Sequence, residues 1–206
     1  MLEALGLECV RGQRRLFRGL SFNLAGGEML WVLGPNGSGK TSLLRLLCGL
    51  LRPDAGNVLW KGEDVRRSPE TFHADLLYLG HAPAVKEDLS GRENLCFGLA
   101  QMGIGITPLE ADSALGEFGL SGRETTPARA LSRGQRRRAA LARLAFGAKR
   151  PLWVLDEPFT ALDAEAVQLV RSHLAQQRTR GGCVVFTSHQ EVDLAGHVVQ
   201  RVQLAQ

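Results

Sequence analysis

Apolar and polar positions follow two patterns along this chain, and each pattern predicts a type of regular element. Residues 41–51 and 164–177 carry apolar side chains at helical spacing, which predicts two helices. A last strand is expected near residues 198–202. Four short runs are almost continuously apolar, as expected of parallel strands buried on both faces of a sheet: Met29–Leu33, Leu76–Leu79, Leu152–Leu155 and Cys183–Thr187. Strands that alternate with helices in this way predict a mainly parallel α/β core.

Two regions depart from that alternation. The first sixty residues are rich in strand patterns, at residues 5–10, 20–24 and 58–60, with a basic turn at residues 11–15. This region predicts an N-terminal antiparallel β part. By contrast, helical patterns alone fill the middle of the chain, at residues 92–102, 108–118 and 133–145. We therefore predict a single domain over residues 1–206, with a core at about 1–81 and 148–206 and an inserted helical subdomain at about 82–147.

Composition narrows the possible classes of function. The 206 residues have a net charge of +4, much of it in arginine clusters at residues 14–18 and 136–138. Such clusters are most often solvated faces, so no direct nucleic-acid partner is expected. The four cysteines are scattered, which argues for a reducing compartment and against a disulfide framework or a metal site. Neither a signal peptide nor an 18-residue apolar stretch is found, so we expect a location on the cytosolic side.

A phosphate-binding loop follows the first buried strand and precedes a helix. Its glycines allow successive backbone N–H groups to converge on phosphate oxygens at the positive end of the helix dipole. Lys40 would supply a charge between the β- and γ-phosphates, and the Thr41 hydroxyl is a natural Mg²⁺ ligand. The predicted nucleotide-binding residues are Gly34, Pro35, Asn36, Gly37, Ser38, Gly39, Lys40, Thr41 and Ser42.

Two carboxylates end the apolar strand Leu152–Leu155. A parallel strand beside the phosphate loop would deliver Asp156 to the magnesium ion. Glu157, one residue further, would orient and deprotonate a water molecule in line with the γ-phosphate. Taken alone, this pair would be weak evidence for a nucleotide site, because many strands end in acidic residues. In a chain that also contains a phosphate loop, the pair is strong evidence. Together the two motifs indicate a nucleotide site with bound ATP and Mg²⁺.

A third segment, Ser132, Arg133, Gly134 and Gln135, opens a helix with a basic face shortly before the Asp156 strand. Its exposed backbone amides form a second helix N-terminus suited to a γ-phosphate. The alternative is that Ser132 simply caps the helix. Both alternatives are compatible with this segment taken by itself.

In order and spacing, these motifs resemble those of the ABC ATPases, a family of P-loop NTPases. Leu131 to Gln135 resembles the family signature, the segment from Thr160 to Asp163 its D-loop, and His189 its switch histidine. The resemblance implies that ATP lies between the phosphate loop of one subunit and the signature of another, so the partner would be a second copy of this chain. It also implies nucleotide contacts by Asp163 and a catalytic contact between His189 and the γ-phosphate.

Three positions differ from the family pattern. His81 replaces the Q-loop glutamine; an imidazole can still bond the attacking water and join the metal site, but it titrates near neutral pH. Arg11 takes the place of the aromatic side chain that stacks on adenine, and Phe17 is a nearby alternative. Arg133 replaces the first signature glycine but keeps the backbone donor, so we expect activity to survive.

Within that family, the chain most resembles the haem-exporter ATPases of cytochrome c maturation, which share the histidine at the Q-loop. The resemblance rests on residues 78–83, Lys86, Leu89 and residues 93–95. It implies an integral membrane permease as partner, a peripheral position on the cytoplasmic face of the inner membrane, and haem handled by partner proteins. An ABC transporter for another substrate, a non-transport ABC ATPase and a soluble P-loop kinase are the alternatives.

Docking on a permease would use the segment after the Q-loop, residues 82–95. Val85 and Leu89 are the expected apolar contacts, with residues 86–88 as a polar rim. Leu95 and Phe97 are expected to pack inside the helical subdomain instead.

Overall fold

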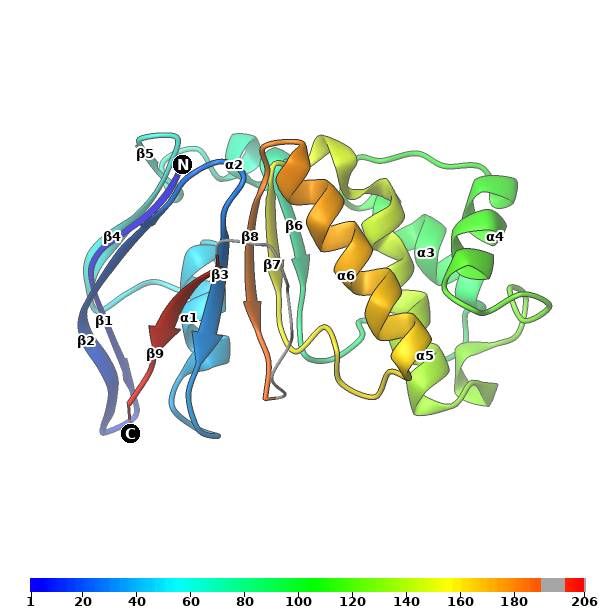
Figure 1. Ribbon diagram of the computed structural model, residues 1–206, viewed down its shortest axis with the longest axis horizontal. Helices are drawn as coiled ribbons and strands as arrows, with labels where there is room; N and C mark the ends of the chain where they lie inside the picture. The colour runs from blue at the N-terminus through cyan, green and yellow to red at the C-terminus, as the bar shows by residue number, and fades with distance from the viewer. Residues whose placement is uncertain (190–198, 206) are drawn as a thin grey trace.

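The computed structural model describes residues 1–189 and 199–205, and it contains two sheets (Figure 1). The first is antiparallel, in the order β2-β1-β4-β5, and consists of β2 (Arg14–Leu24), β1 (Leu2–Arg11), β4 (Ala55–Trp60) and β5 (Glu63–Asp64). The second is parallel, in the order β6-β7-β8-β3-β9, and consists of β6 (Leu76–Leu79), β7 (Leu152–Leu155), β8 (Cys183–Thr187), β3 (Met29–Leu33) and β9 (Val199–Gln203). The predicted α/β fold with a parallel core and an antiparallel N-terminal part is confirmed.

The parallel sheet determines where the functional side chains meet. All residues of β7 and β8 are buried, which explains their unbroken apolar sequences. Because β3, β6, β7 and β8 run in the same direction, the loops that follow them lie at one edge of the sheet. That edge carries the phosphate loop, His81, the Asp156–Glu157 pair and His189.

Helices cover the sheet and extend one end of the molecule. Helix α1 (Lys40–Leu47) follows the phosphate loop, α2 (Pro69–Asp75) precedes β6, and the long α6 (Ala164–Thr179) crosses a face of the parallel sheet (Figure 1). A group of helices stands at the end opposite the antiparallel sheet. It comprises α3 (Gly91–Ala100), α4 (Pro108–Glu117), η1 (Ala128–Ala130), α5 (Arg133–Leu141) and η2 (Ala142–Lys149).

Two apolar clusters fill the space around the parallel sheet. One joins α1 to the antiparallel sheet, and the other runs from the sheet into the helical group, through buried residues such as Leu95 and Leu115. In the second cluster Trp153 packs directly against Gly147, where a Cβ atom would lie 2.4 Å from the indole ring. Residue 147 must therefore be glycine for the helical group to pack this closely on the sheet.

Several elements differ from the sequence expectation for local reasons. Strand β2 was expected over residues 20–24 but begins earlier, at Arg14. Its first residues are charged and exposed, so they did not look like a strand, yet a strand at a sheet edge commonly carries charge. Helix α2 was not predicted; Ser68 and Pro69 begin it, and Phe72 is its one buried residue. The helix expected over residues 133–145 changes at Ala142 into the 3₁₀ segment η2. Residue 198 of the expected last strand lies outside the described residues.

No helix in the described ranges is long and apolar enough to cross a membrane.

Candidate functional site

The phosphate loop is tightly folded, and two glycines show why. At Gly34 a Cβ atom would lie 2.5 Å from the Ser38 hydroxyl and 2.8 Å from a backbone carbonyl. Gly39 has a φ of 102° at the start of α1 and faces Leu16 of β2. The Lys40 ammonium donates to the carbonyls of Gly34 (2.7 Å) and Pro35 (3.3 Å), so its charge lies inside the curve of the loop.

Two of the three expected magnesium ligands, Thr41 and Asp156, are in direct contact. The Thr41 hydroxyl donates to Oδ2 of Asp156 at 2.8 Å, and the Thr187 hydroxyl donates to Oδ1 of the same carboxylate at 2.7 Å. Thr187 in turn accepts the backbone N–H of Glu157 at 2.8 Å. Asp156 is 2% exposed, so this network fixes a carboxylate at the mouth of the phosphate loop.

The carboxylate of Glu157 is buried and only partly bonded. Its Oε2 accepts the backbone N–H of His189 at 3.2 Å and the hydroxyl of Thr160 at 3.3 Å. Its Oε1 lies 3.3 Å from His189 Nε2 but makes no hydrogen bond within the described residues. Glu157 also has a φ of 53°, a left-handed conformation that costs about 1–2 kcal/mol for a residue with a Cβ atom. A buried carboxylate with one uncommitted oxygen can accept a proton from a water molecule.

A cavity of about 340 Å³ unites most of the residues identified in the sequence. His81, Asp156, Glu157 and His189 line it together with the phosphate loop, Leu16 and Ser42. Four loops that are far apart in the sequence therefore meet around one space of suitable size for a nucleotide phosphate chain.

Arg11 does not line this cavity. Its guanidinium donates to the carbonyl of Val10 at 3.0 Å and its side chain is exposed. Strand β2 brings Leu16 and Phe17 against Gly39 of the phosphate loop and the guanidinium of Arg14 near Gly37. Of the two side chains considered for the adenine, Phe17 is the nearer to the phosphate loop, and the stacking of Arg11 on adenine stays a prediction.

Ser132 caps its helix within one chain. Its hydroxyl accepts the backbone N–H of Gln135 at 3.2 Å, and its own N–H donates to the Gln135 side chain at 2.9 Å. Ser132 and Arg133 are exposed, and neither they nor Gly134 and Gln135 line the phosphate-loop cavity of the same chain. The capping role that the sequence left open is thus present, and Arg133 lines a neighbouring cavity together with His81 and Glu157.

Asp163 is also bonded within its own chain. It caps α6 by accepting the N–H of Ala166 at 3.0 Å and pairs with the guanidinium of Arg138. The N–H of Ala166 and the charge of Arg138 together lower the pKa of this exposed carboxyl.

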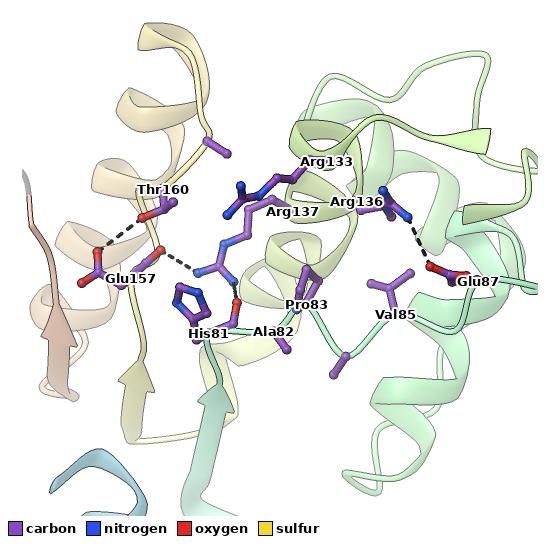
Figure 2. A pocket seen from close by; sticks show the side chains of 12 residues that line it. His81, Ala82, Pro83, Val85, Glu87, Arg133, Arg136, Arg137, Glu157 and Thr160 are labelled. Carbon is purple, nitrogen blue, oxygen red and sulfur yellow. Dashed lines mark hydrogen bonds and ion pairs between the residues drawn. The ribbon is translucent and has the colours of Figure 1, made fainter. Parts of the chain in front are cut away.

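Arg137 was not predicted as part of this region, because it lies in a cluster interpreted as a solvated face. Its side chain is buried and donates to the backbone carbonyls of Asp156 and Glu157 (Figure 2). One available signal was the helical spacing of 137, 140, 141 and 144, which places Arg137 on the apolar face of its helix.

Comparisons with known proteins show the family of this chain. The ABC transporter family model matches residues 17–160. The "Cytochrome c biogenesis ATP-binding export protein CcmA" of Nitrosomonas europaea is 49% identical over 100% of this chain and 96% of its own length. The protein of the same name from Dechloromonas aromatica is 50% identical over 99% of this chain and 100% of its own length.

Solved structures agree with the fold. An "ATP binding subunit of ABC transporter" is 26% identical, with a TM-score of 0.78, and covers 91% of this chain and 79% of its own. A bacterial ABC transporter cassette, described as dimeric, has a TM-score of 0.82 at 21% identity over 100% of this chain and 94% of its own, which shows the fold alone. This chain belongs to the ATP-binding subunits of ABC transporters, in the group of the cytochrome c biogenesis ATP-binding export proteins.

Proposed function

We propose that this chain is the ATP-hydrolysing motor of a haem export or haem-chaperone release complex in cytochrome c maturation. The observation that carries the proposal is the single cavity in which Lys40, Asp156 and Glu157 meet, in a chain about half identical over its full length to proteins named for this export.

Each side chain at the cavity has a step to perform. The amides of the phosphate loop and the Lys40 ammonium bind the β- and γ-phosphates. Glu157 takes a proton from the attacking water through its uncommitted Oε1, and His189 holds that carboxylate and contacts the γ-phosphate. His81, on the same cavity, orients the water.

A magnesium ion fits the oxygen atoms that the chain offers. Mg²⁺ is commonly held by one or two protein oxygens together with substrate phosphates and water. The Thr41 hydroxyl and the Asp156 carboxylate are two such oxygens in mutual contact, and His81 lies close enough to the same cavity to join them. The ion would neutralise charge on the β- and γ-phosphates.

A second copy of the chain would complete each nucleotide site. The phosphate-loop cavity of the same chain is not lined by the residues of the signature and the D-loop, which supports their action on the nucleotide of a partner copy: Ser132, Arg133, Gly134, Gln135 and Asp163. The dimeric description of a cassette with the same fold supports the same arrangement. Each dimer would then contain two composite sites.

A membrane permease would dock beside the Q-loop, holding the chain at the cytoplasmic face of the inner membrane, while haem is handled by partner proteins. A cavity of about 500 Å³ lies there, between residues 81–85, the start of α5 and the segment after Glu157 (Figure 2). Val85 lines this cavity, and Leu89 does not. Leu95 packs in the core as expected, but Phe97 is 41% exposed under the Lys86 ammonium. We infer that residues 82–147 act as one helical subdomain in transmitting the force.

Val85→Asp tests this docking site and the proposed function together. A charge at a buried interface anchor typically costs at least about 2 kcal/mol, so the membrane-bound fraction should fall about tenfold or more. ATP binding should stay near the wild-type level, because Val85 does not line the phosphate-loop cavity. Membrane fractionation and a haem stain for c-type cytochromes measure both consequences.

Leu109→Asp is the matched control, because Leu109 is an apolar residue of α4, is 78% exposed and is remote from this cavity. If Val85→Asp keeps normal membrane recovery and cytochrome levels, residues 82–85 are not the docking site. If an unrelated export fails while cytochromes are normal, the haem assignment is wrong.

His81→Gln tests the histidine at the Q-loop. An imidazole ring and a glutamine amide can each form a hydrogen bond with the attacking water, and His81 shares its cavity with Lys40, Asp156, Glu157 and His189. We therefore expect the glutamine variant to retain substantial ATPase activity and His81→Ala, which keeps no polar group, to lose it. Phosphate-release rates of the two variants decide this, and equal wild-type rates in both would exclude a role for His81 in orienting the water.

A further inference from the structure

One guanidinium joins three segments around the phosphate-loop cavity. Nη2 of Arg137, on α5, donates to the carbonyl oxygens of Asp156 (2.8 Å) and Glu157 (2.7 Å) after β7. Nη1 donates to the carbonyls of Gly80 (3.2 Å) and His81 (3.3 Å) after β6. Figure 2 shows this side chain reaching from its helix between His81 and Glu157.

Placing a charge here is costly. Arg137 is 6% exposed, its hydrogen-bond acceptors are neutral carbonyls, and its Nε has no partner within the described residues. Burial lowers the pKa of this guanidinium, and the nearby carboxylates of Asp156 and Glu157 oppose that change. Residues Ala140, Leu141 and Leu144 on the same face are apolar, so packing alone would be served by an apolar side chain at 137. The cost points to a task that requires these hydrogen bonds.

That task concerns the backbone of Glu157. This residue adopts a left-handed φ of 53°, which a residue with a Cβ atom leaves unless both sides of it are held. Thr187 holds its N–H at 2.8 Å, and Arg137 holds its carbonyl. The same carbonyl also accepts the N–H of Thr160 at 3.2 Å, so removing Arg137 leaves one longer hydrogen bond in place of two. The peptide that carries the Glu157 carboxylate would then be held less firmly against its left-handed conformation.

We propose that Arg137 is a positioning residue that holds Glu157 in its reactive orientation and links this orientation to helix α5. The same helix begins at the Ser132 segment, so a movement of α5 is transmitted through Arg137 to Glu157 and to His81. Arg137 itself does not line the phosphate-loop cavity; it lines the adjoining cavity near Val85. This inference rests on the proposed role of Glu157 as the base.

A purely structural role for Arg137 is the competing explanation, and Arg150 provides a matched control. It too is buried and donates to three backbone carbonyls, those of His73, Ala74 and Met102. It touches neither Asp156 nor Glu157. Substituting either arginine removes a similar set of hydrogen bonds from the fold, but only Arg137 borders the site.

The experiment compares Arg137→Gln, Arg137→Lys, Arg150→Gln and Glu157→Gln in the full chain assembled with its membrane partner. We expect Arg137→Gln to lower kcat about 100-fold, the size of a lost positioning contact, with KM for MgATP within about threefold. Arg137→Lys should recover part of kcat, since an ammonium reaches some of the four carbonyls. Arg150→Gln should lower Tm to a similar extent but leave kcat within about twofold. Adding Arg137→Gln to Glu157→Gln should give no further loss of residual turnover, because both changes remove the same function.

The inference is overturned if Arg137→Gln and Arg150→Gln lower kcat equally at an equal loss of Tm. It is also overturned if Arg137→Gln lowers the residual turnover of Glu157→Gln by the same factor as it lowers the turnover of the wild type. Should the glutamine variant fail to fold, Arg137→Lys carries the same comparison, and a wild-type kcat there overturns it too. If Glu157→Gln turns over normally, the base itself is misassigned and the proposed mechanism fails. If Glu157→Gln is inactive while Arg137→Gln is normal, only the role of Arg137 is wrong.

Discussion

Glu157→Gln is expected to stop ATP turnover while leaving nucleotide binding intact. The substitution keeps the shape of the side chain, including the bonds from His189 and Thr160, but an amide cannot take the proton of the attacking water. Loss of a general base typically lowers the rate by about 10²–10⁴-fold. Because ATP would bind and persist, the variant should also accumulate as an ATP-bound dimer.

Phosphate release and size-exclusion chromatography with ATP measure these two consequences. Glu165→Gln is a suitable control, since Glu165 is an exposed carboxylate in the first turn of α6 and lies outside the cavity. It should behave as wild type in both assays. Normal turnover by Glu157→Gln in the assembled complex would mean that another group accepts the proton.

Lys40→Ala should weaken nucleotide binding as well as abolish hydrolysis. Lys40 is 8% exposed, and its ammonium lies among the carbonyls of the phosphate loop, where a phosphate oxygen would gain a charge-assisted bond. Such a bond is worth about 1.5–3 kcal/mol, so affinity for ATP should fall about 10–100-fold. Hydrolysis should be lost, because the same charge stabilises the transferring phosphoryl group.

Equilibrium binding of a fluorescent ATP analogue, followed by phosphate release, tests Lys40→Ala. Lys149→Ala removes an exposed lysine at the end of η2 and so controls for the lost charge. It should leave the affinity for the ATP analogue and the rate of phosphate release unchanged. An affinity of Lys40→Ala equal to that of wild type would remove this side chain from the phosphate contacts. The two variants separate binding from chemistry, since Glu157→Gln should affect only the second.

The sequence predicted well which residues lie at the carboxyl ends of the parallel strands. Buried parallel strands appear as unbroken apolar runs, and the polar residues that follow them must meet at one edge of the sheet. Strand β7 followed by Asp156 and Glu157 is the clearest case. The surroundings of the phosphate loop on the side of β2 were harder to predict, for the opposite reason. An exposed edge strand such as β2 carries little periodic signal, so its register beside the phosphate loop could not be read, and Leu16 was overlooked.

Arg137 shows a different limit of sequence-based prediction. Three consecutive arginines look alike in a sequence, yet α5 turns them in different directions. Arg136 pairs with Glu87 at 3.4 Å, Arg138 pairs with Asp163, and Arg137 enters the interior. The backbone carbonyls that bind Arg137 have no sequence signature. Only the packing of α5 against the ends of β6 and β7 reveals them.

The position of β3 within the parallel sheet has a consequence for how the chain is made. Met29 pairs with Val184 of β8 and with Val199 of β9, so both neighbours of this strand come from the last quarter of the sequence. During synthesis the phosphate loop leaves the ribosome early, but the strand that supports it has no partner until translation is almost complete. Contacts this distant in sequence form slowly, and unpaired apolar strands are prone to aggregation. A chain released before residue 183 therefore carries a complete phosphate-loop sequence after a strand that lacks both of its partners in the parallel sheet.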